Sequence, residues 1–129
     1  MSANPKKVRR WKRQEVRSKR HSITIGGGFV IVVDYLWKPG RVITFAAILT
    51  KFQNDTGGWD EICHYDTAHG FAHLDILDEH RRVINKIPMS GPVSYKGAFT
   101  YAINDLKKNY QKYWEDYCAR QGKDCNEGL

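Results

Sequence analysis

The hydrophobic positions of the chain change their spacing near Pro88. Before it, short runs rich in β-branched and aromatic residues alternate with clusters of Gly, Pro, Asn and Asp. Such runs are typical of β-strands, and short turns between them favour antiparallel pairing of consecutive strands. A glycine triplet inside the first run predicts a bulge, a bend or a close approach of the backbone. The expected strands cover residues 22–35, 41–52, 59–66, 71–77 and 83–87.

After Pro92 the apolar residues recur at intervals of three and four. This spacing places them on one face of a single amphipathic helix, which Gly122 is expected to end. The stripe consists of Phe99, Ala102, Ile103, Leu106, Tyr110, Tyr113, Trp114 and Tyr117. The sequence therefore predicts an α+β fold, in which one long C-terminal helix packs on an antiparallel meander of four to five strands.

Positive charge is concentrated at the N-terminus. Residues 1–20 hold nine of the 21 lysines and arginines against one acidic residue, Glu15, whereas the remainder has twelve basic and thirteen acidic side chains. Few apolar side chains occur in this segment, so it cannot offset its ordering entropy by burial. We therefore expect a mobile basic arm over residues 1–21, one domain over 22–122 and a tail over 123–129.

A basic arm on an electrically neutral body is typical of proteins that contact phosphates, so RNA or DNA is the expected partner. The other interpretations are a solubilising tail, a contact with anionic lipid, or an acidic protein partner. The residues expected to contact nucleic acid are Lys6, Lys7, Arg9, Arg10, Trp11, Lys12, Arg13, Arg17, Lys19 and Arg20.

The remaining composition bears on the compartment. No apolar run approaches the roughly 20 residues that cross a bilayer, and no apolar segment follows the basic N-terminus as in a secretory signal. Three cysteines form no disulfide framework, although Cys118 and Cys125 could pair in an oxidising medium. We expect reduced thiols, a cytoplasmic protein and no membrane partner.

Candidate chemistry is confined to residues 64–75, which hold three of the five histidines and two aspartates. If residues 67–70 close a four-residue hairpin loop, Asp66 lies opposite Phe71 and His64 opposite His73. Because side chains alternate between the faces of a strand, both histidines, Asp66 and Asp75 then share one face, with His69 at its mouth. The other face is apolar and is the expected core, with Cys63, Tyr65, Ala72, Leu74 and Ile76.

This face has three interpretations. His64 and His73 could act as acid and base on a phosphodiester, assisted by His69 and Asp66, because an imidazole titrates near neutral pH. The same imidazoles with Asp75 could instead bind a divalent metal. The third interpretation is structural, with the histidines satisfying the two carboxylates. The first requires no metal and no cofactor, and none is predicted.

The string His64-Tyr65-Asp66-Thr67-Ala68-His69-Gly70, followed by His73, resembles a Y-D-x-A-H-G-x-x-H box of a small uncharacterised prokaryotic family. Its layout is similar to that of TumE-type toxins of toxin–antitoxin pairs. The match covers Tyr65, Asp66, His69, Gly70 and His73. It departs at His64, Thr67 and Asp75, where the pattern has arginine, asparagine and often histidine, and the basic arm is not part of it.

The resemblance implies an RNA-directed toxin with a cognate antitoxin-like partner. The function predicted from the sequence is therefore a small nucleic-acid-binding protein, the RNA-directed toxin of such a pair, that uses the His/Asp hairpin face. The alternative is a non-enzymatic interaction module whose basic arm contacts an acidic protein. Whether the protein is an enzyme stays open at this point.

Overall fold

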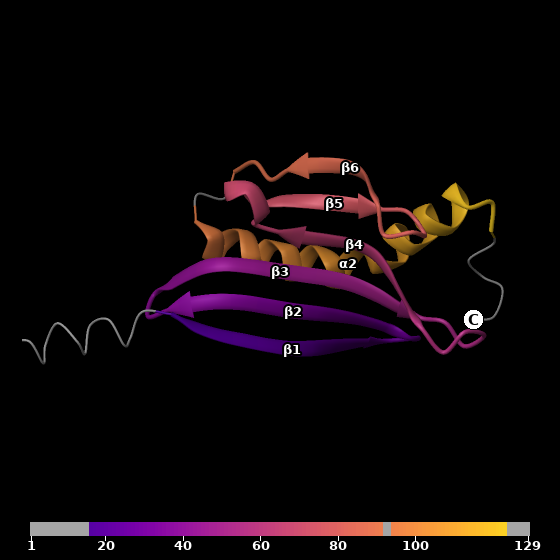
Figure 1. The fold of residues 1–129 in the computed structure, drawn as a ribbon, viewed down its shortest axis with the longest axis horizontal. Coiled ribbons are helices and arrows are strands. Elements are labelled where there is room, and N and C mark those ends of the chain that lie inside the picture. Colours follow the sequence, from indigo (N-terminus) through magenta and orange to yellow (C-terminus); the bar gives the residue numbers. More distant parts are fainter. Residues whose placement is uncertain (1–15, 92–93, 124–129) are drawn as a thin grey trace, which may run out of the picture.

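The fold is a six-stranded antiparallel sheet with one long helix across one of its faces (Figure 1). The computed structural model describes residues 16–91 and 94–123. The strands follow one another in chain order across the sheet, so the predicted α+β meander with one C-terminal helix is confirmed. The elements are β1 (Arg17–Gly26), β2 (Phe29–Lys38), β3 (Arg41–Phe52), β4 (Trp59–Asp66), the short 3-10 helix η1 (Ala68–Gly70), β5 (His73–Leu77), β6 (Val83–Pro88) and α2 (Tyr95–Arg120).

The glycine triplet corrects the predicted number of strands. Gly26 pairs with Phe29, and between them Gly27 and Gly28 have φ values of 62° and 85°. Two residues with positive φ form the tight turn that matches the twist of an antiparallel hairpin, and only glycine adopts it without strain. The first predicted strand is therefore two strands, β1 and β2, with a register shift between Thr24 and Gly26. Strand β1 also begins at Arg17, inside the segment that was expected to be the mobile arm.

The hydrophobic core lies between the sheet and α2. Alternate residues of the central strands point toward the helix, and the helix buries the predicted stripe against them. The fully buried side chains Ile31, Leu49 and Leu106 come from β2, β3 and α2 respectively. Other core residues on these elements and on β4 and β5 are Phe29, Val33, Phe45, Ala47, Cys63, Tyr65, Leu74, Ala98, Ala102, Trp114, Tyr117 and Cys118.

Both ends of α2 have capping contacts. The hydroxyl of Ser94 accepts a hydrogen bond from the backbone N–H of Gly97 at 3.1 Å, which satisfies one free donor of the first turn. At the other end Gly122 has a φ of 69°, the left-handed conformation common after the last helical residue, so the predicted stop is confirmed.

The sheet face opposite α2 carries the predicted site. Two neighbouring rows of directly paired residues cross all six strands on this face. The first row is Arg20, Asp34, Ala46, Asp66, His73 and Pro88; the second is Ser22, Val32, Ile48, His64, Asp75 and Lys86. Pairing across the whole sheet therefore links the basic edge strand β1 to the histidines of β4 and β5.

The cysteines differ in part from expectation. Cys63 is free and buried in the core, as the face assignment predicted. Cys118 on α2 is disulfide-bonded, whereas reduced thiols were expected. Among residues 16–91 and 94–123, no helix has the length and apolar character needed to cross a membrane.

Candidate functional site

Two histidines and two aspartates meet on the sheet face opposite α2. The Nε2 atom of His64 lies 3.1 Å from an Oδ2 atom of Asp66 and 3.0 Å from Oδ2 of Asp75. The Nε2 atom of His73 lies 2.9 Å from Oδ1 of Asp66 and 3.3 Å from Oδ2 of Asp75. We refer to these four residues as the His/Asp cluster. The alternation of the strand residues predicted that the four share one face, and the structure brings them into contact.

The pairing inside the hairpin differs from the prediction by two residues. His64 lies opposite Asp75, and Asp66 lies opposite His73. A shift of two residues leaves every side chain on its predicted face, because the alternation of a strand has a period of two. It changes the partners, however, so that each imidazole stands opposite a carboxylate instead of opposite the other imidazole.

The six-residue connection between β4 and β5 explains this shift. Thr67 continues along β3, where its hydroxyl accepts a hydrogen bond from the backbone N–H of Phe45 at 3.1 Å. The carboxylate of Asp66 accepts one from the backbone N–H of Ala68 at 3.0 Å, which starts the turn. His69 and Gly70 then adopt positive φ values of 68° and 85°. The loop thus takes up two more residues than the predicted four.

The cluster has a buried and an accessible half. The side chain of His73 has no exposed surface and that of Asp75 is 5% exposed, whereas His64 and Asp66 are 20% and 21% exposed. The ring of Phe71 packs against His73, with 4.9 Å between the ring centroids. A ligand or solvent molecule therefore reaches the cluster past His64 and Asp66.

The two accessible groups shift each other's titration. The hydrogen bond with Asp66 outweighs partial burial and raises the pKa of His64 above its usual value. Burial alone would raise the pKa of Asp66, but its hydrogen bonds with His64 and with the Ala68 N–H prevail and lower it. Both shifts favour a protonated His64 beside an ionised Asp66 in the absence of other ligands.

These shifts predict the pH dependence of the metal-free protein. The raised pKa of His64 stabilises the fold fully below pH 6.5, its ordinary value, and this contribution is lost as pH rises through the raised pKa. The lowered pKa of Asp66 stabilises the fold above pH 3.8 and is lost as pH falls through the lowered pKa. We expect the melting temperature to fall as pH increases above 6.5, and to fall less in a His64→Gln variant. A wild-type decline identical to that of the variant would contradict the assignment.

His73 is held by its other ring nitrogen. Its Nδ1 lies 3.0 Å from the backbone carbonyl oxygen of Phe71, and because a carbonyl only accepts hydrogen bonds, Nδ1 carries the proton. In the neutral ring, Nε2 therefore presents a lone pair to Asp66 and Asp75. This buried nitrogen has no aligned hydrogen-bond partner among the described residues, although it lies within ion-pair distance of both carboxylates. The distances are short, but the direction of the ring nitrogen does not match a hydrogen bond.

The alternation of β4 and β5 did not reveal one member of the site. Lys86 on β6 donates a hydrogen bond from Nζ to Oδ1 of Asp75 at 2.8 Å. Lys86 stands directly opposite Asp75, but this pairing depends on a register shift between Ile76 and Leu77 that no sequence pattern marks. A lysine among exposed β6 residues carries no signal of its own, so the sequence analysis missed it.

The other predicted site residues lie apart from the cluster. His69 is exposed in η1, and no hydrogen bond or ion pair joins it to the cluster within the described part of the chain. Arg17, Lys19 and Arg20 are exposed on β1, where the Arg17 guanidinium lies 5.8 Å from the Trp37 ring centroid. The remaining predicted contacts, Lys6, Lys7, Arg9, Arg10, Trp11, Lys12 and Arg13, lie outside the described residues.

A shallow depression of about 410 Å³ adjoins the cluster between β2 and the start of the β4–β5 loop. It is lined in part by Asp34, Thr44, Ala46, Asp66 and Ala68. Asp66 therefore belongs both to the cluster and to the wall of the depression. Asp34 also lies 4.0 Å from the Arg20 guanidinium, so the depression extends from the basic edge of the sheet toward the histidines.

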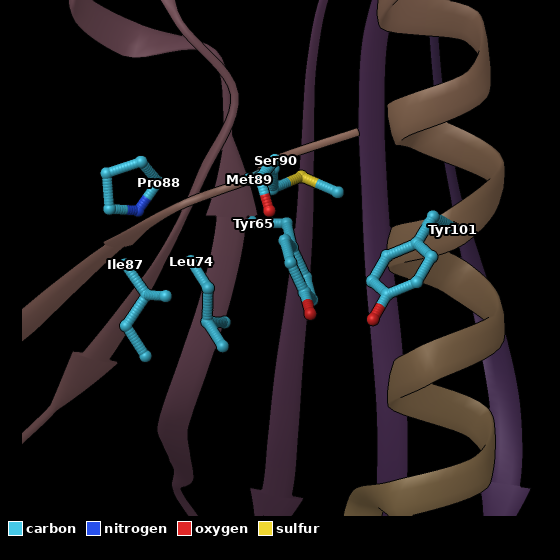
Figure 2. A pocket seen from close by; sticks show the side chains of 7 residues that line it. All are labelled: Tyr65, Leu74, Ile87, Pro88, Met89, Ser90 and Tyr101. Carbon is cyan, nitrogen blue, oxygen red and sulfur yellow. The ribbon is translucent and has the colours of Figure 1, made fainter. Parts of the chain in front are cut away.

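A second hollow lies on the helix side of the sheet. Figure 2 shows the side chains of Tyr65, Leu74, Ile87 and Tyr101 there. These residues line a cavity of about 250 Å³. Tyr65 and Tyr113 both donate hydrogen bonds to Asp105, a network that the sequence analysis did not anticipate. Since Tyr65 and Leu74 alternate with the cluster residues, this cavity and the His/Asp cluster open on opposite faces of the sheet.

Comparison with known proteins adds the family and no activity. No curated protein and no solved structure matches the chain, so the resemblance to TumE-type toxins stays a prediction. One family model, described as a domain of unknown function (DUF7718), matches residues 10–123. This match covers both strands of the cluster, the whole of α2 and part of the basic N-terminal segment, and the chain therefore belongs to the DUF7718 family.

Proposed function

We propose that the protein binds nucleic acid through its basic N-terminal segment and brings it across the uncovered sheet face to the His/Asp cluster. The observation that carries this proposal is the place of β1. Exposed Arg17, Lys19 and Arg20 continue the basic arm along the edge of the sheet, and Arg20 belongs to the same row as Asp66. Three strand spacings separate them, a distance of about 14 Å.

The chemistry of the path suits a nucleotide chain. Basic side chains at the edge attract phosphates, whereas the carboxylates of Asp34 and Asp66 in the depression accept hydrogen bonds from amino groups of bases. The volume of the depression, about 410 Å³, falls within the range of small-ligand pockets, about 300–1,000 Å³. A single strand offers unpaired bases, so we propose single-stranded RNA as the first ligand to test.

The proposal includes an RNA-directed toxin activity at the cluster, which is what the family resemblance implies. His64 is the imidazole that a substrate can reach, because its side chain is partly exposed. His73 has no exposed surface, which does not favour a direct proton exchange between the two histidines and a phosphodiester. In this proposal His73 and Asp75 position the accessible pair.

The second candidate is a protein-interaction module, and one observation favours it. Strand β6 lies at the edge of the sheet, with exposed Val83, Ile84 and Ile87 along it. An edge strand with exposed apolar side chains can pair with a strand of another protein. If a cognate antitoxin-like or acidic protein binds at β6, its affinity should not change when His64 is replaced.

Nucleic-acid binding is tested by replacing Arg9, Arg10, Lys12 and Arg13 with glutamine in the full chain. The control replaces Lys96, Lys107, Lys108 and Lys112 of α2, which are exposed and change the net charge equally. Each phosphate contact contributes about 0.7 to the slope of log affinity against log salt for a single strand. We expect the arm variant to lose a slope of about 2–3 and the control to keep the wild-type slope, measured by fluorescence anisotropy with single-stranded RNA.

Equal losses in both variants would show that net charge alone attracts the RNA and would contradict a specific role of the arm. The same reactions analysed on denaturing gels report cleavage. Unchanged RNA over a range of pH, with and without divalent metals, would sink the toxin activity and leave the binding proposal intact.

A further inference from the structure

We propose that the His/Asp cluster is a binding site for one divalent first-row transition metal ion, with Zn²⁺ the best match. The ligands would be Nε2 of His64, Nε2 of His73, Oδ2 of Asp75 and one carboxylate oxygen of Asp66. The donor atoms of His64, Asp66 and Asp75 already lie within 4.8 Å of one another. This site goes beyond the proposed function, because it would stand even if the protein bound no nucleic acid.

The spacing of the donor atoms matches the coordination sphere of such an ion. The nitrogen–oxygen distances between the histidines and the aspartates run from 2.9 to 3.3 Å; the two distances to Asp66 involve different oxygens, Oδ2 for His64 and Oδ1 for His73. Ligands about 2.0–2.1 Å from a metal lie roughly 3.3 Å apart in a tetrahedron and roughly 3.0 Å apart at the neighbouring corners of an octahedron. The observed distances cover this interval.

His73 supplies an independent observation. Its Nδ1–H donates to the carbonyl of Phe71, and its Nε2 is wholly buried, faces two carboxylates and lacks an aligned hydrogen bond. A lone pair placed against carboxylate oxygens is unfavourable unless a metal ion or a proton lies between them, and the missing alignment of a hydrogen bond favours the ion over the proton. Metal-bound histidines commonly donate their second ring N–H to a carbonyl or carboxylate, which is the arrangement of His73.

The charge of the cluster leaves room for a cation. Asp66 and Asp75 carry two negative charges, and Lys86 supplies one positive charge through its hydrogen bond to Oδ1 of Asp75. Oδ2 of Asp75 remains directed at both imidazoles. Lys86 therefore orients Asp75 as an outer partner would. With both imidazoles neutral, as metal binding requires, one negative charge is left for an ion to neutralise.

The donor types select the class of metal. Imidazole nitrogens together with carboxylates suit Zn²⁺ and its neighbours in the first transition row, whereas Mg²⁺ and Ca²⁺ prefer sets of oxygen ligands. The competing occupant of the cluster is a proton, because the same imidazole nitrogens bind either. A cluster that holds protons only would be the structural ion-pair network that the sequence analysis also considered.

The test uses the full chain without any histidine tag, freed of metal by a chelator and then titrated with Zn²⁺ or Mg²⁺ in a calorimeter. We expect one Zn²⁺ per chain and no competition from Mg²⁺ in excess. The variants are His64→Gln and Asp66→Asn, which change the two partly exposed ligands. Since losing an outer partner of a metal site costs about 10–100-fold in affinity, losing a ligand should weaken Zn²⁺ binding by at least about 100-fold.

The matched control is the double variant Glu79→Gln and His80→Gln. These residues form an exposed ion pair of 3.5 Å in the β5–β6 turn, away from the cluster. The control should bind Zn²⁺ as the wild type does. Zn²⁺ should also raise the melting temperature of the wild type and the control but not of the ligand variants, and melting of the metal-free samples checks that each variant is folded.

Three results would overturn the metal site: no stoichiometric Zn²⁺ binding by the wild type, retained binding in folded His64→Gln and Asp66→Asn variants, or equal binding of Mg²⁺. These results are separate from failure of the proposed function, because the titration contains no nucleic acid. Conversely, loss of the salt-dependent RNA binding would leave a metal titration of the same protein unchanged.

Discussion

Asp75→Ala should destabilise the metal-free protein by about 1.5–3 kcal/mol, the usual contribution of hydrogen bonding with a charged group, because the charges left behind on Lys86 and His64 are partly solvated. The Asp75 side chain is 5% exposed and contacts His64 and Lys86 with its two oxygens. Without this carboxylate, the Lys86 ammonium and the protonated imidazole of His64 each lose a negatively charged partner. The free energy of unfolding, measured by urea denaturation at pH 6.5, checks the expectation.

The matched control for this variant is Asp34→Ala. Asp34 lies on the same face of the sheet, but half of its side chain is exposed, and its one ion pair among the described residues, with Arg20, is 4.0 Å long. Exposed pairs contribute roughly 0–1 kcal/mol, so the control should change stability little. Equal, small effects of both replacements would show that Asp75 does not hold the His/Asp cluster together.

The second large effect is expected from Leu106→Ala in α2. Leu106 is fully buried between the helix and the sheet, and replacements of this kind cost about 2.7–5 kcal/mol because a cavity remains. For a domain of this size, we expect the melting temperature to fall by about 10 °C or more. Thermal unfolding followed by calorimetry and by far-ultraviolet circular dichroism would check the expectation.

The control for Leu106 is Leu36→Ala on β2, where the residue is 36% exposed, against 0% for Leu106. Removing the same atoms there leaves no cavity and should shift the melting temperature by only a few degrees. A Leu106→Ala variant as stable as the Leu36→Ala variant would mean that α2 does not cover the sheet as the structure has it.

The parts of the fold that could be predicted from the sequence are those in which burial of one face produces a periodic pattern of hydrophobic residues. The stripe through Ala102, Leu106 and Tyr117 marked the inner face of α2, and all three side chains are buried. The alternation of Cys63 and Tyr65 marked the core face of β4 in the same way. Both features depend only on which side chains leave water, and a single sequence records this directly.

Strand β1 left no such signal. Its first residues, from Arg17 to Ser22, are exposed on an edge strand that is held by backbone pairing with β2. Every residue type except proline can form the same backbone hydrogen bonds. The sequence of a polar strand held only by backbone pairing therefore resembles the sequence of an unstructured segment. The glycine triplet was ambiguous for a related reason, since a bulge and a tight turn both favour glycine.

For the His/Asp cluster, the sequence predicted which residues share one face of the sheet but not which of them contact each other. Assigning His64 and Asp75 to one face needed only the alternation of β4 and β5. Their direct pairing depends on the hydrogen bond between the Thr67 hydroxyl and the backbone of Phe45, 22 residues away in the chain. A tertiary contact of this kind sets the length of the loop, and local sequence rules do not include it.

Alternate residues of β4 belong to two different parts of the protein. Cys63 and Tyr65 pack in the hydrophobic core, whereas His64 and Asp66 belong to the His/Asp cluster. Adding or deleting a single residue within β4 would exchange the two sets, so that the imidazole of His64 would enter the hydrophobic core and the phenol of Tyr65 would enter the cluster. Single substitutions in β4 keep its register with β3 and β5, whereas an insertion or deletion changes that register. The core on one face and the cluster on the other therefore both constrain the register of β4.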